Sequence, residues 1–226
     1  MKKLRIKDVI KFRKKRTEST KKTFIQNLKN ERNQQNNSEA RNYWVRSESA
    51  IKSTFKHNEP RYITDKLNEL NELLLDPTHH SNTIKQYKHN VIILKQFENF
   101  DFNLIKPSDN IKILSQRTED KILTIKGLPV ECVPSFVYSF DDDDEIGAIW
   151  FIAQKDGFKK EELGMFADIL GRYLKLYFAE KYVINSQYCI VVDLYNRKFI
   201  RCSQLDEGAI PKVLDRTLEE INKITQ

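Results

Sequence analysis

The spacing of apolar residues predicts helices between residues 43 and about 100. Apolar side chains recur there every three or four positions, which places them on one face of a helix. Polar and proline residues interrupt this pattern at two points and divide it into three helices. The predicted helices begin near Ser47, which can act as an N-cap, at Thr64 and at about Ser81, and they end near Pro60, at Asp76-Pro77 and at Phe97.

After Pro107 the pattern predicts mainly strands. The segment Glu145–Gln154 is apolar on both faces, which is typical of a central strand that is covered on both sides. Asp141–Asp144 precedes it and predicts a polar hairpin tip. The other predicted strands are Ile111–Leu114, Lys121–Lys126, Val130–Phe140, Tyr188–Leu194 and Lys198–Cys202, with a long helix at Lys159–Glu180 and a terminal helix after Pro211.

The order of these elements predicts a mixed α/β fold. A helical part, residues 43–106, precedes a sheet part, residues 107–226, in which a crossover helix joins the strands of one central sheet. We expect these two parts to form one core. The pair of helices around residues 56–62 also fits a helix-turn-helix, although any pair of amphipathic helices produces that pattern.

The positive charge of the chain is concentrated near its beginning. The formal net charge is +7, yet residues 1–32 hold 13 Lys or Arg and only 3 Asp or Glu. The remaining residues are slightly acidic. Residues 33–42 carry almost only polar side chains, so they predict a linker. We therefore expect a basic helical arm at 1–32 that makes few contacts with a core at 43–226.

The basic arm is a candidate nucleic-acid interface. Clustered Lys and Arg neutralise phosphates without reading bases, which gives salt-sensitive binding that tolerates any sequence. Two alternatives are a solvated helix face and a helix that docks on an acidic protein partner. A membrane-surface helix is disfavoured because the apolar face lacks Trp. The candidate nucleic-acid-binding residues are Lys11, Arg13, Lys14, Lys15, Arg16, Lys21 and Lys22.

Composition excludes several other classes of protein. No run of about 20 apolar residues is present to cross a bilayer, and charged residues occupy the place of a secretory signal. Three cysteines without C-x-x-C spacing disfavour a disulfide framework and a zinc site, and they fit a cytoplasmic protein. No cofactor-binding motif is present, so we expect no cofactor.

The order of elements resembles the restriction-endonuclease-like, or PD-(D/E)XK, nuclease superfamily over about residues 47–205. In that family a strand ends in an Asp that often follows Pro, and the next strand carries Glu-x-Lys. The resemblance implies that the carboxylates hold Mg²⁺, which activates water, and that the Lys stabilises developing charge. Here Ser135, after Pro134, stands at the Asp position, and Ala153 replaces the Glu that precedes Lys155.

These departures favour a protein without catalysis. A hydroxyl and a methyl group cannot replace two anionic ligands of Mg²⁺. The resemblance implies a setting in prokaryotic restriction, defence or mobile elements. One alternative is an active Mg²⁺-dependent nuclease whose metal ligands have moved to other positions, with Lys155, Glu131 and Asp193 as candidate catalytic residues. Glu131 and Ser135 are four residues apart in the predicted strand Val130–Phe140, so we expect them to share a strand face. Another alternative is a scaffolding subunit without nucleic-acid binding.

Overall fold

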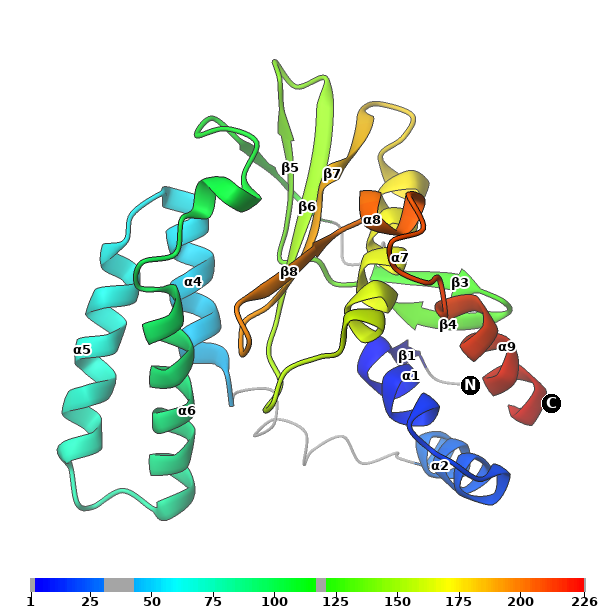
Figure 1. Cartoon of the computed structure of the whole chain (residues 1–226), viewed down its shortest axis with the longest axis horizontal. Helices are drawn as coiled ribbons and strands as arrows, with labels where there is room; N and C mark the ends of the chain where they lie inside the picture. The colour runs from blue at the N-terminus through cyan, green and yellow to red at the C-terminus, as the bar shows by residue number, and fades with distance from the viewer. Residues whose placement is uncertain (1–2, 31–42, 117–120, 226) are drawn as a thin grey trace.

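The computed structural model describes residues 3–30, 43–116 and 121–225. It is a mixed α/β structure, as expected, with helices on both faces of a five-stranded sheet (Figure 1). The strand order is β2-β5-β6-β7-β8. The bounds of these strands are Lys112–Leu114, Phe136–Phe140, Glu145–Ile152, Val183–Asp193 and Lys198–Arg201.

The topology of this sheet follows the predicted order of elements, except that the predicted strand Lys121–Lys126 belongs to a second, smaller sheet, so the prediction of one central sheet is wrong. Strands β2, β5 and β6 form an antiparallel meander. Helix α7 (Lys160–Tyr177) then crosses one face, so that β7 returns parallel to β6, and β8 pairs antiparallel with β7. A parallel return needs such a crossover because the chain must travel back to the same end of the sheet. The prediction of a central strand at Glu145–Gln154 is confirmed by β6.

A bundle of three helices covers one face of the sheet. Alternate residues of β6 point to opposite faces, and Ile149, Phe151 and Ala153 join the core beneath this bundle. Ala148 and Ile152 face the opposite core, which lies beneath α7. The bundle consists of α4 (Val45–His57), α5 (Arg61–Leu75) and α6 (Ser81–Phe97), followed by the short helix η2 (Phe102–Ile105).

The helix boundaries differ from expectation at the first two starts. Helix α4 begins at Val45, and Ser47 is buried inside it instead of capping it. The Ser47 hydroxyl donates to the side-chain oxygen of Asn90 at 2.8 Å, which ties α4 to α6. Pro60 stands at the N-cap of α5. The N–H groups at the start of a helix have no acceptor within the helix, so a proline, which lacks an N–H, is tolerated there. Asn58 ends α4 in a left-handed conformation.

The predicted strand Val130–Phe140 is wrong, because the structure divides it between two sheets. Strand β4 (Leu128–Glu131) belongs to a three-stranded sheet of order β1-β4-β3, in which β3 spans Ile122–Ile125. The chain then leaves this sheet and enters the large one at β5. Pro134 lies in the gap and has no N–H for a ladder, which explains the break. Glu131 and Ser135 therefore do not share a strand face.

The expectation that the basic arm makes few contacts with the core is also wrong. Strand β1 (Leu4–Arg5) pairs in parallel with β4, with Leu4 opposite Val130. Helices α1 (Ile6–Arg13) and α2 (Glu18–Asn30) follow, and they pack near α7 and the terminal helix α9 (Leu214–Thr225) (Figure 1). The apolar side chains of this segment belong to the core under α7, namely Leu4, Ile6, Val9, Ile10, Phe12 and Ile25.

Burial of this apolar set explains why the segment docks. Most of its charges, with the exception of Lys7, occupy outward positions of two amphipathic helices, whereas its apolar residues face inward. The predicted linker, residues 33–42, lies outside the described residues.

Among the residues that the structure describes, no helix is long and apolar enough to cross a bilayer. The short helix α8 (Ser203–Asp206) connects β8 to the segment before α9.

Candidate functional site

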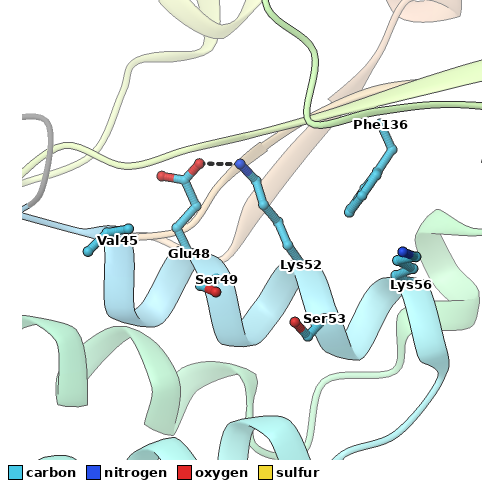
Figure 2. Close-up of a pocket in the computed structure, with 7 residues that line it drawn as sticks. All are labelled: Val45, Glu48, Ser49, Lys52, Ser53, Lys56 and Phe136. Atoms are coloured by element: carbon cyan, nitrogen blue, oxygen red, sulfur yellow. Dashed lines mark hydrogen bonds and ion pairs between the residues drawn. The ribbon is translucent and has the colours of Figure 1, made fainter. Parts of the chain in front are cut away.

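A groove of about 370 Å³ lies between α4 and the beginning of β5 (Figure 2). Helix α4 contributes polar and charged side chains at intervals of three and four residues, so they lie on one face of the helix. Phe136, the first residue of β5, faces them from the sheet. The helical residues that line the groove are Val45, Glu48, Ser49, Lys52, Ser53 and Lys56.

The charge in the groove is predominantly positive. Lys52 Nζ lies 2.5 Å from Glu48 Oε1, in an ion pair between successive turns (Figure 2). Lys56, one turn further along, is exposed, and no carboxylate of the described residues forms an ion pair with it. Glu48 therefore offsets one of the two lysines, and the far end of the groove remains basic.

Aromatic packing fixes the position of Phe136. Its ring stacks on Phe55 of α4, with centroids 5.7 Å apart and an interplanar angle of 15°. Phe55 is fully buried and also meets Phe151 edge-on at 5.6 Å. Ser135 anchors the backbone beside the ring, because its N–H donates to the Ile149 carbonyl and its Oγ accepts from the Phe151 N–H at 3.0 Å. The ring is thus a rigid wall of the groove.

Lys7 of α1 links the N-terminal helix to this end of the sheet. Its Nζ donates to the carbonyl oxygen of Ala153 at 2.9 Å, just beyond the end of β6. Burial lowers the pKa of Lys7, while the nearby carboxylate of Glu48 partly opposes this shift. Lys7 thus adds positive charge beside α4, although its burial makes that charge costly.

Asp193 occupies the end of β7 and holds the adjacent turns together. Its Oδ2 accepts from the Phe158 N–H at 2.8 Å and from Asn196 Nδ2 at 3.0 Å, and its Oδ1 accepts from the Tyr195 N–H at 3.1 Å. Burial raises the pKa of Asp193, and these hydrogen bonds oppose the shift. Gly157 passes close by at φ +68°, where a Cβ would collide with the Asn196 side chain. Both carboxylate oxygens of Asp193 therefore already accept hydrogen bonds within the protein.

Of the other candidate catalytic residues, Glu131 lies in the second sheet, whereas Lys155 belongs to the turn that carries Gly157 beside the Asp193 carboxylate. Glu131, in the three-stranded sheet, forms ion pairs with Lys3 at 2.5 Å and with Arg5 at 3.5 Å. Lys155 is exposed in the turn after β6, and Ala153 is buried under the helical bundle. Within the described ranges, no three His, Cys, Asp or Glu side chains are placed to hold a metal ion.

Acidic side chains of the same molecule engage most of the basic residues predicted to bind nucleic acid. Arg13 and Lys14 reach Glu161 and Glu162 of α7, each at 2.8 Å, and Lys21 reaches Glu220 of α9 at 2.5 Å. Such exposed pairs add little stability, but they lower the charge available to a ligand. The remaining contacts are Lys22 with Glu18 at 2.7 Å, Lys11 with Asp8 at 4.0 Å and Lys15 over the Phe24 ring at 5.7 Å, while Arg16 is exposed.

Sequence reasoning missed the residues of the α4 groove. The available signal was the repeat of Ser49 with Ser53 and of Lys52 with Lys56, each four residues apart on the polar face of a predicted helix. That signal marks a helix face but does not identify what lies opposite. Only the tertiary structure places Phe136 there.

Comparison of the chain with models of protein families, with curated proteins and with solved structures found no match.

Proposed function

We propose that this protein binds nucleic acid without cleaving it, and that the α4 groove is the principal contact. The observation that carries this proposal is the row of Lys52, Lys56 and two serine hydroxyls along one face of α4. Lysines neutralise phosphates, and hydroxyls donate to phosphate oxygens, so the row suits a sugar-phosphate backbone. Exposed Lys15 and Arg16 add positive charge elsewhere.

The nuclease-like interpretation of the core belongs to the same proposal. An antiparallel meander, a crossover helix and a parallel return agree with the element order on which the resemblance rests. The residues at the metal-binding positions do not fit Mg²⁺, because Ala153 offers a methyl group and the Ser135 hydroxyl already accepts a backbone hydrogen bond. A cytoplasmic location and a role in prokaryotic defence are further parts of this proposal, and they rest on the resemblance and the composition.

Binding titrations at several salt concentrations test the proposal. Fluorescent oligonucleotides of unrelated sequence should bind with similar affinity, and log K should fall linearly with log salt concentration. The double variant Lys52→Ala/Lys56→Ala should flatten that slope by up to about 1.4 to 1.8, since each lost phosphate contact contributes about 0.7 for single strands and 0.9 for duplexes. Lys85→Ala/Lys88→Ala on the exposed surface of α6 is the matched control. An unchanged slope in the groove variant would refute this site.

Incubation of the same complexes with Mg²⁺ or Mn²⁺ tests the absence of cleavage. We expect the oligonucleotides to stay intact. Metal-dependent cleavage that Lys155→Ala abolishes would establish the alternative, an active nuclease with migrated ligands. The absence of salt-dependent binding to any nucleic acid would instead favour the scaffolding alternative, in which the basic surface meets an acidic protein.

A further inference from the structure

The α4 groove combines an aromatic ring with positive charge, and this combination distinguishes between kinds of nucleic acid. We infer that the groove binds a single strand, with one base stacked on Phe136 and the backbone phosphates along Lys52 and Lys56. This inference rests on the proposed function and narrows its ligand. Proteins that bind single strands without sequence preference use the same pair of features, a basic groove and aromatic rings that stack on bases.

Phe136 is presented to the groove in a way that suits stacking. One face of its ring is covered by Phe55 in a nearly parallel arrangement. The remainder of the ring lines the groove between the side chains of Lys52 and Lys56 (Figure 2). The side chain is only partly buried. A base that enters would continue the stack that Phe55 and Phe136 begin, without moving either ring.

The α4 side chains are spaced to follow a strand. Lys56 lies one helical turn beyond Lys52, and Ser53 lies one turn beyond Ser49. One turn advances about 5.4 Å along the axis, so each pair offers two successive contacts along one line. Glu48 pairs with Lys52 at one end of that line, so a phosphate at Lys52 competes with this carboxylate, whereas Lys56 has no ion pair with a carboxylate of the described residues. The groove therefore contacts an extended backbone at more than one point.

The position of the ring disfavours a duplex. Bases in a duplex are stacked on one another, so their faces are not available to a side chain, whereas the unstacked bases of a single strand are. Phe136 lies between a helix and the sheet, in a groove of about 370 Å³, which is within the size range of sites for small ligands. An unstacked nucleotide suits such a space, while a duplex could touch only its rim.

Competition binding with matched oligonucleotides tests the inference on the full chain. A 15-nucleotide single strand and a strand of 15 abasic sites carry the same number of phosphates, and the duplex of the 15-mer carries twice as many, but of the three probes the single strand alone presents open base faces. The wild-type protein should bind the single strand at least tenfold more tightly than the abasic strand and the duplex at the same salt concentration. Equal affinity for the three probes, or tighter binding of the duplex, would overturn the inference while leaving salt-dependent binding intact.

Variants at Phe136 provide the second measurement. Phe136→Leu should weaken binding of the single strand by about 5- to 140-fold, the range expected for loss of one stacked base, and leave the abasic strand unaffected. Phe136→Tyr keeps the ring and should retain the affinity. Phe100→Leu removes a half-buried ring elsewhere and is the matched control. Unaltered single-strand affinity of Phe136→Leu would refute the stacking role. If that variant fails to fold, the comparison of the three probes on the wild-type protein still decides.

Discussion

Truncation of Phe12 to alanine should destabilise the whole protein, because α1 is part of the core. The Phe12 side chain is 0% exposed, and the ammonium of Lys21 lies over its ring at 5.3 Å. Replacement of a buried Phe by Ala typically costs about 3–5 kcal/mol, out of a total stability of about 5–15 kcal/mol. With an m-value of about 2–3 kcal/mol per molar urea, the unfolding midpoint should fall by about 1–2.5 M.

Urea unfolding monitored by tryptophan fluorescence is a suitable assay. Trp150 of β6 packs edge-on against Phe166 of α7, with centroids 5.2 Å apart, so it reports on the central core. Arg16→Ala alters an exposed side chain of the same segment and should shift the midpoint by less than about 0.3 M. A midpoint for Phe12→Ala that matches Arg16→Ala would refute the reasoning and restore the interpretation of a separable arm.

Deletion of residues 1–32 is the more severe form of this test. The segment contributes six buried apolar side chains, each worth about 1.5–3 kcal/mol of burial. Their loss is on the order of 10 kcal/mol, which is comparable with the entire stability of a typical domain. We expect the truncated chain to lose its cooperative transition, whereas unfolding at an unchanged midpoint would contradict the observed packing.

Three further predictions follow from buried groups. Asp193→Ala should destabilise the protein by about 2–5 kcal/mol in thermal or urea unfolding, because the Phe158 and Tyr195 amides lose their acceptor. Asp193→Asn keeps one acceptor oxygen and should lower the free energy of unfolding by less. The pKa of Lys7 is lowered in the folded protein, so between that pKa and 10.5 the unfolded chain binds more protons than the folded chain. In this pH range the free energy of unfolding of the wild-type protein should therefore rise with pH relative to that of Lys7→Met. A difference between the two proteins that does not change with pH would contradict this. Cys132, Cys189 and Cys202 are buried. Burial raises the pKa of Cys132, and a hydrogen bond with Cys189 together with burial raises the pKa of Cys202, so a thiol reagent at pH 8 should label the cysteines only after unfolding. Rapid labelling of the native protein would show an accessible thiol.

The parts of the fold that could be predicted are those whose pattern is local. The helix Ser81–Phe97 was predicted with its observed bounds, because its apolar face repeats without interruption. Strand β6 was recognisable because apolar residues on both faces require cover on both sides. The break at Pro134 is harder to predict because the residues on either side of it are equally strand-like. A proline is also tolerated in an edge strand, so the pattern alone does not show that β4 and β5 pair in different sheets.

The candidate site depends on contacts that no local pattern contains. The charges of residues 1–32 are visible in the sequence, but the ion-pair partners of Arg13 and Lys21 lie on α7 and α9, far along the chain. Phe136 and Lys56 are separated by 80 positions in the sequence and meet only because α4 packs against the sheet. Pattern reasoning therefore identified a basic surface and could not identify the groove.

The pairing of β1 with β4 has a consequence for how the chain folds during synthesis. Leu4 finds its strand partner only when Val130 has been made, and Lys21 and Lys29 reach α9 at Glu220 and Thr225. At about 5–20 residues per second, the ribosome takes roughly 10–40 s to produce α9 after α2. The apolar faces of α1 and α2 have no native partners on α9 during that interval. Residues 4–30 therefore leave the ribosome well before their partners on α9 and wait for them to reach their final place, which gives chaperones a long period of access to their apolar faces.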